Sequence, residues 1–238
     1  MKKKLILLTG ATGEIGSSIV DYFLKKNFQI IGISRKKKLN KKNFFHYSFD
    51  LKHFDLYEQK LNEITKKHGK IDSFIHSAGI QEIIPINIVQ KEDIYRSLDI
   101  NFVSPFLFVR HMKNRKIFKR NASAVIISSL MSEISDAGMS LYSSSKSACL
   151  GLIRSSAIEF AKYNIRVNSI SPGTINNKMF KKYKNKIHKS KIDDLIKRYP
   201  LGLGNNLDIN LCIEYLISDK NKWVTGQNIV LDGGFSVK

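Results

Sequence analysis

Two residues with complementary chemistry, Tyr142 and Lys146, stand four positions apart in the chain. In a helix, residues at this spacing lie on the same face, one above the other. A tyrosine titrates near pH ~10, and a neighbouring cation favours its ionised form. The pair therefore predicts a phenol that exchanges a proton with a carbonyl or an alcohol near neutral pH. An isolated pair of this kind is more often a surface aromatic beside a solvated lysine, so the surrounding sequence decides between the two interpretations.

A glycine-rich turn follows the first apolar run of the chain. Residues 9–16 read Thr-Gly-Ala-Thr-Gly-Glu-Ile-Gly. Such glycines permit a tight turn and let the backbone approach a diphosphate, while the N–H groups of the next helix point at that anion. The residues expected to contact a dinucleotide here are Gly10, Thr12, Gly13, Glu14, Ile15 and Gly16. The Glu14 carboxylate would repel a diphosphate, so we expect its side chain to turn toward solvent or a cation.

The end of the second apolar run predicts which dinucleotide is bound. An acidic residue at this place would bind the ribose hydroxyls of NAD, but the chain has Ser34 and Arg35. A hydroxyl and a guanidinium suit a 2′-phosphate, because arginine offers planar recognition with several donors. The sequence therefore predicts NADP(H) in preference to NAD(H). Asp50 and Leu51, after the third run, are expected beside the adenine.

Size and composition indicate one globular domain. The chain has 238 residues with a hydrophobic fraction of 42%, enough for one large α/β domain with a full core. The start of the chain is basic and then apolar, but its apolar part, residues 5–8, is shorter than the roughly 7–15 residues of a signal peptide. No apolar run approaches the roughly 20 residues that span a bilayer. We expect a cytoplasmic protein without a membrane span.

The net charge of +20 leaves the partner open. A strongly basic balance is found in nucleic-acid-binding proteins. Here the lysines are spread widely among asparagine and isoleucine, a composition that AT-rich coding also produces. We therefore expect a solvated basic surface and no specific nucleic-acid partner, with an acidic partner or a phosphorylated substrate as the alternative.

The cysteines and histidines predict no metal site. Cys149 and Cys212 belong to no CxxC pair, and no His/Cys cluster has zinc spacing. Both cysteines lie in apolar helical stretches, which is typical of buried thiols. The six histidines are scattered, and no role is assigned to them.

Short β-branched runs alternate with longer helical stretches. This alternation predicts a Rossmann-type, doubly wound parallel sheet of about seven strands with helices on both faces, in a single domain over residues 1–238. The expected strands are Lys4–Thr9, Gln29–Ser34, Phe44–Asp50, Ser73–His76, Ala124–Ser128, Arg166–Ser171 and Asn228–Leu231. The expected helices are Ile15–Lys26, Asp55–His68, Ile94–Arg115, Tyr142–Tyr163 and Asp208–Ser218.

A lysine-rich segment, Asn176–Lys191, follows a Pro-Gly turn. It is either a solvated surface helix or part of a mobile substrate lid over about residues 175–200.

Several ordered motifs together resemble the short-chain dehydrogenase/reductase family over almost the whole chain. The motifs are the Thr9-Gly10 turn, His76-Ser77-Ala78-Gly79, Asn101, Ile127-Ser128-Ser129, Tyr142 with Lys146, Val167 to Gly173, and Val224 to Gly234. The closest resemblance is to classical members, which include 3-oxoacyl-[acyl-carrier-protein] reductases.

This resemblance implies a role for each matching residue. Tyr142 would be the general acid in ketone reduction, and Lys146 would hold the nicotinamide ribose and acidify the tyrosine. Ser129, or less favourably Ser128, would bind the substrate carbonyl, and Asn101 would support a water-linked proton relay. The remaining implied cofactor contacts are Ser77, Ala78, Gly79, Pro172, Gly173 and Ile175.

Two departures from the family pattern concern cofactor binding. Glu14 stands where classical members have glycine, which leaves glycines at positions 10, 13 and 16, and Ser77 stands where the second asparagine of Asn-Asn-Ala-Gly is usual. The catalytic set is intact.

The implied function is interconversion of a ketone and a secondary alcohol with a nicotinamide cofactor. A 3-oxoacyl thioester is the leading substrate, and a sugar or nucleotide-sugar intermediate of surface glycan synthesis is an alternative. A catalytically silent dinucleotide-binding regulator is another. The candidate docking residues for an acidic carrier are Arg110, Lys113, Arg115 and Lys116. The resemblance also implies a homotetramer or dimer, built on the helices that contain Asn101 and Tyr142.

Overall fold

The computed structural model describes residues 3–35, 40–184 and 189–237. Seven parallel strands form one sheet in the order β3-β2-β1-β4-β5-β6-β7. Their bounds are β1 Leu5–Thr9, β2 Gln29–Ser34, β3 Phe44–Ser48, β4 Ile71–His76, β5 Phe118–Ile127, β6 Arg166–Pro172 and β7 Asn228–Leu231. The doubly wound α/β architecture predicted from the sequence is confirmed.

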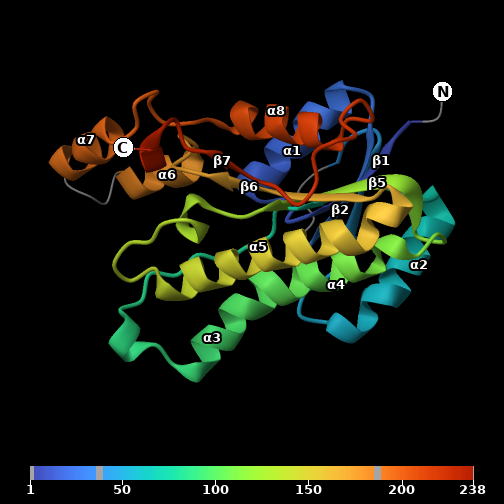
Figure 1. Ribbon diagram of the computed structural model, residues 1–238, viewed down its shortest axis with the longest axis horizontal. Coiled ribbons are helices and arrows are strands. Elements are labelled where there is room, and N and C mark those ends of the chain that lie inside the picture. Colours follow the sequence, from blue (N-terminus) through green and yellow to red (C-terminus); the bar gives the residue numbers. More distant parts are fainter. Residues whose placement is uncertain (1–2, 36–39, 185–188, 238) are drawn as a thin grey trace.

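Helices cover both faces of the sheet (Figure 1). One face carries α1 (Glu14–Lys25) and α8 (Asn206–Ile217), and the other carries α2 (Tyr57–His68), α4 (Ser104–Arg110) and α5 (Ser140–Phe160). Strand β1 contributes side chains to the packing on both faces of the sheet. Its Leu5 and Leu7 pack toward α2, α4 and α5, whereas Ile6 and Leu8 pack toward α1 and α8, because successive side chains point to opposite faces.

The strand order reverses beside β1. The chain passes from β1 outward to β2 and β3, and then crosses back to place β4 on the other side of β1. At the carboxyl end of β1, Thr9 is in register with Ile33 of β2 and with His76 of β4. In open α/β sheets this switch point opens a crevice that binds ligands.

The predicted helix Ile94–Arg115 is wrong as a single element. Helix α3 (Lys91–Leu98) leads into a π-helical turn, Asp99–Val103, then α4, then a 3-10 turn at His111–Lys113. Pro105 supplies the reason. It has no N–H to donate to the carbonyl four residues back, and its ring crowds that carbonyl. The main-chain hydrogen bonds of the helix therefore change their spacing, and the Ser104 N–H donates to the Asp99 carbonyl, five residues back.

Other predicted elements exist with different ends. Strand β3 ends at Ser48, and Asp50 lies in a turn where its Oδ1 accepts from the Lys52 N–H at 3.1 Å. Strand β5 begins at Phe118, before the predicted Ala124, and α5 begins at Ser140. Within the described residues no helix has the length and apolar character that crossing a bilayer requires. The predicted buried thiol holds for Cys149, whereas Cys212 is half-buried.

Two helices, α6 (Lys178–Lys184) and α7 (Lys189–Lys197), follow β6 in the predicted lid region. Residues 185–188 of that region lie outside the described residues. Phe180, Ile192 and Tyr199 are buried, which holds the helices against the molecule. The ends of the segment are tied together, since Ile175 bridges Gly204 and the Asn176 N–H donates to the Gly204 carbonyl at 2.8 Å.

Candidate active site

Helix α5 brings Tyr142 and Lys146 together at the carboxyl edge of the sheet. The Lys146 Nζ lies 5.8 Å from the centre of the Tyr142 ring. Lys146 is only 4% exposed, and its Nζ donates to the Ile127 carbonyl at the end of β5 at 2.8 Å. Tyr142 is half-buried. The ammonium is therefore fixed against the sheet beside a phenol that solvent or a substrate can reach.

Asn101 is fully buried in the π-helical turn, and both the oxygen and the nitrogen of its side-chain amide are hydrogen-bonded. Its Oδ1 accepts from the Ile80 N–H, and its Nδ2 donates to the Ile80 carbonyl and to the Ser145 hydroxyl, all at 2.9 Å. A methyl group on Gly79 would lie 3.2 Å from Asn101 Oδ1 and 3.3 Å from Lys146 Nζ. Gly79, Asn101 and Lys146 thus converge on one point.

The main-chain carbonyl of Asn101 has an unusual partner. Pro105 cannot donate to it, and instead the Cys149 thiol of α5 lies 3.2 Å away. Burial raises the pKa of Cys149, which keeps the thiol protonated and able to donate. Ser145 and Pro105 were not singled out from the sequence, and Cys149 was predicted only as a buried thiol, although Ser145 directly precedes Lys146 and a proline inside a predicted helix is a visible signal.

The two serines after β5 differ in what their hydroxyl protons do. The buried Ser128 donates its hydroxyl proton to the Lys146 carbonyl at 3.1 Å. Ser129 Oγ accepts from the Met131 N–H at 3.2 Å, so its own proton remains available for a carbonyl oxygen. The geometry therefore favours Ser129 over Ser128 as a hydrogen-bond donor to a substrate.

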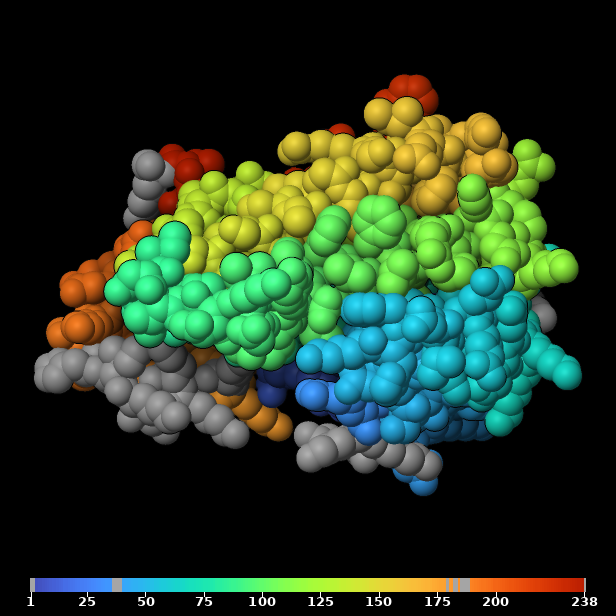
Figure 2. All heavy atoms as spheres, turned by 90° about the horizontal axis from the view of Figure 1, so that it is seen from below, coloured from blue at the N-terminus to red at the C-terminus, as the bar shows by residue number. Residues whose placement is uncertain are grey.

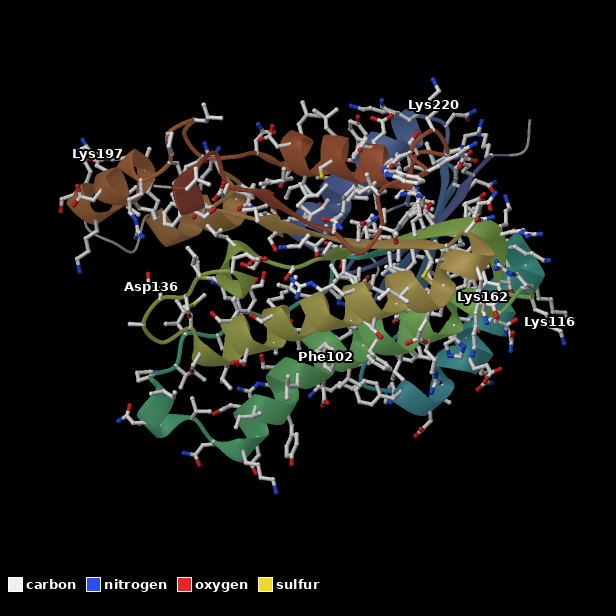
Figure 3. All side chains as sticks on the ribbon, viewed as in Figure 1. Phe102, Lys116, Asp136, Lys162, Lys197 and Lys220 are labelled. Carbon is white, nitrogen blue, oxygen red and sulfur yellow. The ribbon has the colours of Figure 1, made fainter. Side chains whose placement is uncertain are left out.

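Hydroxyl groups fasten the β5–α5 loop to the first turns of α5. The Ser147 hydroxyl donates to the Ser132 carbonyl at 2.9 Å, and the Ser135 and Ser143 hydroxyls are 2.8 Å apart. Asp136 of this loop points outward at the end of the molecule that also carries Lys197 of α7 (Figure 3). These bonds hold Ser129 and Tyr142 on one rigid unit.

The glycine-rich turn fits a dinucleotide. A methyl group on Gly10, which has φ of 69°, would come within 2.6 Å of the Ala78 nitrogen, and one on Gly16 within 2.1 Å of the Gly10 carbonyl oxygen. Helix α1 begins at this turn without a side-chain cap, which leaves its first N–H groups for an anion. The Ser77 hydroxyl is buried and has no hydrogen-bond partner among the described residues, so a bound ligand or water would satisfy it.

The other predicted cofactor contacts flank this turn. Arg35 is exposed at the end of β2, and Asp50 is half-buried after β3. Leu51 and Ile175 are buried in the core, so only their backbone atoms are available to a ligand. Gly173, after Pro172, is pressed against Tyr199, since a methyl group there would lie 3.0 Å from its ring.

The Glu14 side chain reaches the start of α6 at the protein surface, where it meets a main-chain N–H and no cationic group of the described residues. Its Oε1 accepts from the main-chain N–H of Lys178 at 3.5 Å. As the first residue of α1, its carboxylate competes with any anion at that helix terminus. Glu14→Gln is therefore expected to tighten NADPH binding about two- to fivefold, measured by fluorescence titration. Asp21→Asn, later in the same helix, is the control, and unchanged affinity in Glu14→Gln would contradict this view.

His76, at the carboxyl end of β4, is fully buried behind this site. Its Nδ1 is 2.8 Å from the Thr9 hydroxyl, and its Nε2 has no partner among the described residues. Burial, and then the Lys146 charge, lower its pKa to about 3, although the Ile100 and Ala78 carbonyls act in the opposite direction. His76 is therefore a neutral imidazole wedged between the glycine-rich turn and Lys146.

This buried imidazole predicts an acid-sensitive fold. The unfolded chain binds a proton at His76 below about pH 6.5, whereas the folded chain resists it down to about pH 3. The contribution of His76 to the free energy of unfolding is therefore fully present above about pH 6.5 and is lost as the pH falls toward about 3. Lowering the pH from 7 to 5 should cost about 2 kcal/mol through this residue alone. Urea unfolding should show this difference between the parent protein and His76→Asn, and equal pH dependence in both would refute it.

The basic residues proposed for carrier docking are far from the site within this chain. Lys116 precedes β5 and lies at the amino edge of the sheet together with Lys162, opposite the end with Asp136 (Figure 3). Arg115 is also engaged, since its Nη1 donates to the Lys119 carbonyl at 2.8 Å. Carrier docking at Arg110, Lys113, Arg115 and Lys116 stays a prediction, at a distance from the candidate site within one chain. Among the residues that the structure describes, no three His, Cys, Asp or Glu side chains gather as metal ligands would.

Comparison with known proteins agrees with this geometry. Residues 11–236 match the family model described as enoyl-(acyl carrier protein) reductase. A 3-oxoacyl-[acyl-carrier-protein] reductase of Buchnera aphidicola subsp. Schizaphis graminum is 33% identical over 98% of both chains.

Solved structures with this fold carry either form of the cofactor. ElxO with NADP bound has a TM-score of 0.89 at 25% identity and covers 100% of both chains. The 4-hydroxyisoleucine dehydrogenase complexed with NADH has a TM-score of 0.90 at 30% identity, over 99% of this chain and 100% of the other. With the family model matched from the glycine-rich turn to the last turn, the chain belongs to the short-chain dehydrogenase/reductase family of oxidoreductases.

Proposed function

We propose that this protein is an NADP(H)-preferring oxidoreductase that interconverts a ketone and a secondary alcohol. The observation that carries the proposal is the convergence of Tyr142, Lys146, Asn101 and Gly79 at the carboxyl edge of the sheet, beside the glycine-rich turn. A nicotinamide dinucleotide bound along that edge supplies or accepts the hydride.

The side chains have separate tasks in this proposal. Tyr142 gives its phenolic proton to the carbonyl oxygen during reduction and takes it back in the reverse direction. Ser129, whose hydroxyl proton is available, donates a hydrogen bond to the same oxygen and stabilises its developing charge. Lys146 holds a positive charge beside the phenol, and Asn101 supports the relay that returns the proton to Tyr142.

The preference for NADP(H) rests on Ser34 and Arg35. The exposed guanidinium follows directly after β2, where the ribose of the adenosine half lies in this fold. Arginine pairs well with phosphate. Since structural relatives are described with NADP and with NADH, the test is the ratio of kcat/KM for the two reduced cofactors. A ratio that favours NADH would overturn the preference.

A 3-oxoacyl thioester is the proposed substrate. The support is the 33% identity to a 3-oxoacyl-[acyl-carrier-protein] reductase over nearly the full length of both chains. The helices α6 and α7 form the lid of this site in the proposal, and the protein acts in the cytoplasm. NADPH oxidation should be followed with acetoacetyl thioesters, sugars, nucleotide sugars and simple ketones. Reduction of a sugar in preference to the thioester would replace this substrate, and NADPH binding without oxidation of NADPH by any of them would indicate a silent regulator.

The same proposal includes a homotetramer or a dimer. On the α4 and α5 side, Phe106 is 44% and Ile158 is 81% exposed, and Figure 2 shows α5 (yellow) and α4 (green) side by side on that surface. A second apolar group, Leu211, Tyr215 and Trp223, is exposed beside α8. Two separate apolar faces suit two kinds of subunit contact. Sedimentation that finds only monomer at micromolar concentration would contradict this part.

A further inference from the structure

A chain of hydrogen bonds joins β7 to the loop that carries Ser129. It begins at Asn228, the first residue of β7. The Asn228 Nδ2 donates to the Glu133 carboxylate at 2.6 Å. Its Oδ1 accepts from two hydroxyls of β6, from Ser169 at 2.6 Å and from Ser171 at 2.9 Å. These partners fix the orientation of the amide, because a carboxylate only accepts whereas a hydroxyl can donate.

The pairing of β6 with β7 places this amide on the face of the sheet that α5 covers. Asn228 is in register with Ser169, and alternate residues of a strand point the same way. Val167, two residues before Ser169, packs in the core beneath α5, whereas Ile170 packs toward α1 and α8. The Asn228 side chain therefore lies on the same side of the sheet as the proposed proton donor.

Ser132 joins this chain of bonds to Ser129 and to α5. It lies in the 3-10 turn that follows Ser129. Its Oγ donates to the Ser129 carbonyl at 2.7 Å and is 3.0 Å from the Ser171 Oγ. A hydroxyl has a single proton and a carbonyl only accepts, so the proton between Ser132 and Ser171 comes from Ser171. The Ser132 carbonyl in turn accepts from the Ser147 hydroxyl of α5 at 2.9 Å.

We propose that Asn228 is a positioning residue for Ser129, which acts through Ser171 and Ser132 to hold the turn from which the Ser129 hydroxyl donates to a ketone substrate. This inference rests on the role of Ser129 in the proposed function and extends it to the edge strand of the sheet. The competing explanation is that these bonds only fasten β7 and the loop to the rest of the molecule.

Reversal of the amide–carboxylate pair tests the proposal with side chains of nearly unchanged shape. In Asn228→Asp the second oxygen faces the Glu133 carboxylate, and their repulsion should draw the side chain away from the Ser171 hydroxyl. We expect kcat for the best ketone of the substrate panel above to fall about three- to tenfold, as loss of one hydrogen bond does. The KM and the NADPH dissociation constant should stay within about twofold, because Ser129 acts mainly on the charge that develops in the transition state.

A second substitution should rescue the first. Glu133 is exposed, and Glu133→Gln alone should change kcat less than about twofold, because its side-chain oxygen still accepts from Asn228. Combined with Asn228→Asp, it should restore most of the lost rate, since the glutamine amide then donates to the aspartate. Gln227→Glu is the matched control. It makes the same change from amide to carboxylate at the neighbouring exposed position, where the side chain donates to the Thr225 carbonyl, and it should leave kcat unchanged.

Ser129→Ala separates positioning from a purely structural role. If Asn228 acts through the Ser129 hydroxyl, Asn228→Asp should lower kcat no further in a protein that already carries Ser129→Ala. A further fall by the same factor would assign the network a structural role and overturn the inference. A lower melting temperature with unchanged kcat in Asn228→Asp, or a loss that Glu133→Gln fails to rescue, would overturn it as well.

The outcomes also distinguish this inference from the proposed function. If Ser129→Ala lowers kcat and Asn228→Asp does not, the inference is overturned and the proposed function stands. If Ser129→Ala leaves kcat unchanged, or if the parent protein reduces no ketone of the panel, the role of Ser129 and the inference both fall.

Discussion

Replacing Tyr142 by phenylalanine is expected to lower kcat for ketone reduction about 100- to 10,000-fold, the range attributed to general acid catalysis. Phenylalanine keeps the ring that lies 5.8 Å from the Lys146 ammonium and removes only the hydroxyl. The NADPH dissociation constant should therefore stay within about twofold, because the phenol is not the main support of the dinucleotide. Stopped-flow NADPH oxidation gives the rate, and fluorescence titration gives the affinity.

The matched control for this substitution is Tyr163→Phe. Tyr163 also carries a cation beside its ring, since the Arg115 guanidinium lies 5.1 Å from the ring centre, but it stands beyond the far end of α5. It should retain full activity. Activity that persisted in Tyr142→Phe, or fell equally in both variants, would rule out the assigned proton donor.

Gly16→Ala is expected to have the second largest effect, on cofactor binding. The added methyl group would lie 2.1 Å from the Gly10 carbonyl oxygen, which is a backbone atom and cannot rotate away. The turn must then open, at a cost of about 1–3 kcal/mol in the free energy of unfolding, as for other overpacked sites. If the same strain is felt on binding, the NADPH dissociation constant rises about 10- to 100-fold.

Gly151→Ala provides a control of the same chemistry. Gly151 lies in α5, and a methyl group there would meet nothing within 4 Å in the chain. Alanine in a helix interior should raise stability by about 0.5–1 kcal/mol relative to glycine. Calorimetric unfolding and NADPH titration of both variants check the pair. Unimpaired NADPH binding in Gly16→Ala would show that close packing of the turn is not required for the ligand.

The sequence predicted well those strands and helices whose formation depends mainly on residues next to one another in the chain. Every predicted strand exists, because β-branched runs between polar turns specify buried strands almost regardless of their neighbours. The helix across residues 94–115 was wrong because Pro105 acts through hydrogen-bond geometry that hydrophobic periodicity does not report. The ends of β3 and β5 also differed, since the length of a strand depends on the partner strand beside it.

The sequence predicted those parts of the candidate site in which reactive residue types stand at a fixed spacing in the chain. The pairing of Tyr142 with Lys146 is local to one helix, so the sequence alone predicted it. The parts that depend on distant contacts were not readable. His76 and His46 looked like scattered histidines until the pairing of β1 with β4 brought Thr9 beside His76, and the pairing of β2 with β3 brought Ser34 beside His46.

The backbone closure between residues 175–176 and Gly204 has an evolutionary consequence. It joins the two ends of the excursion over residues 177–203 by main-chain contacts, and the Tyr199 hydroxyl adds a clasp by accepting from the Thr174 N–H at 2.9 Å. The sheet and the proton-transfer residues lie outside this excursion, so its two ends meet independently of them. If α6 and α7 form the proposed lid, substitutions within residues 177–203 would change which substrate is accepted while the proton-transfer residues on α5 stay in place.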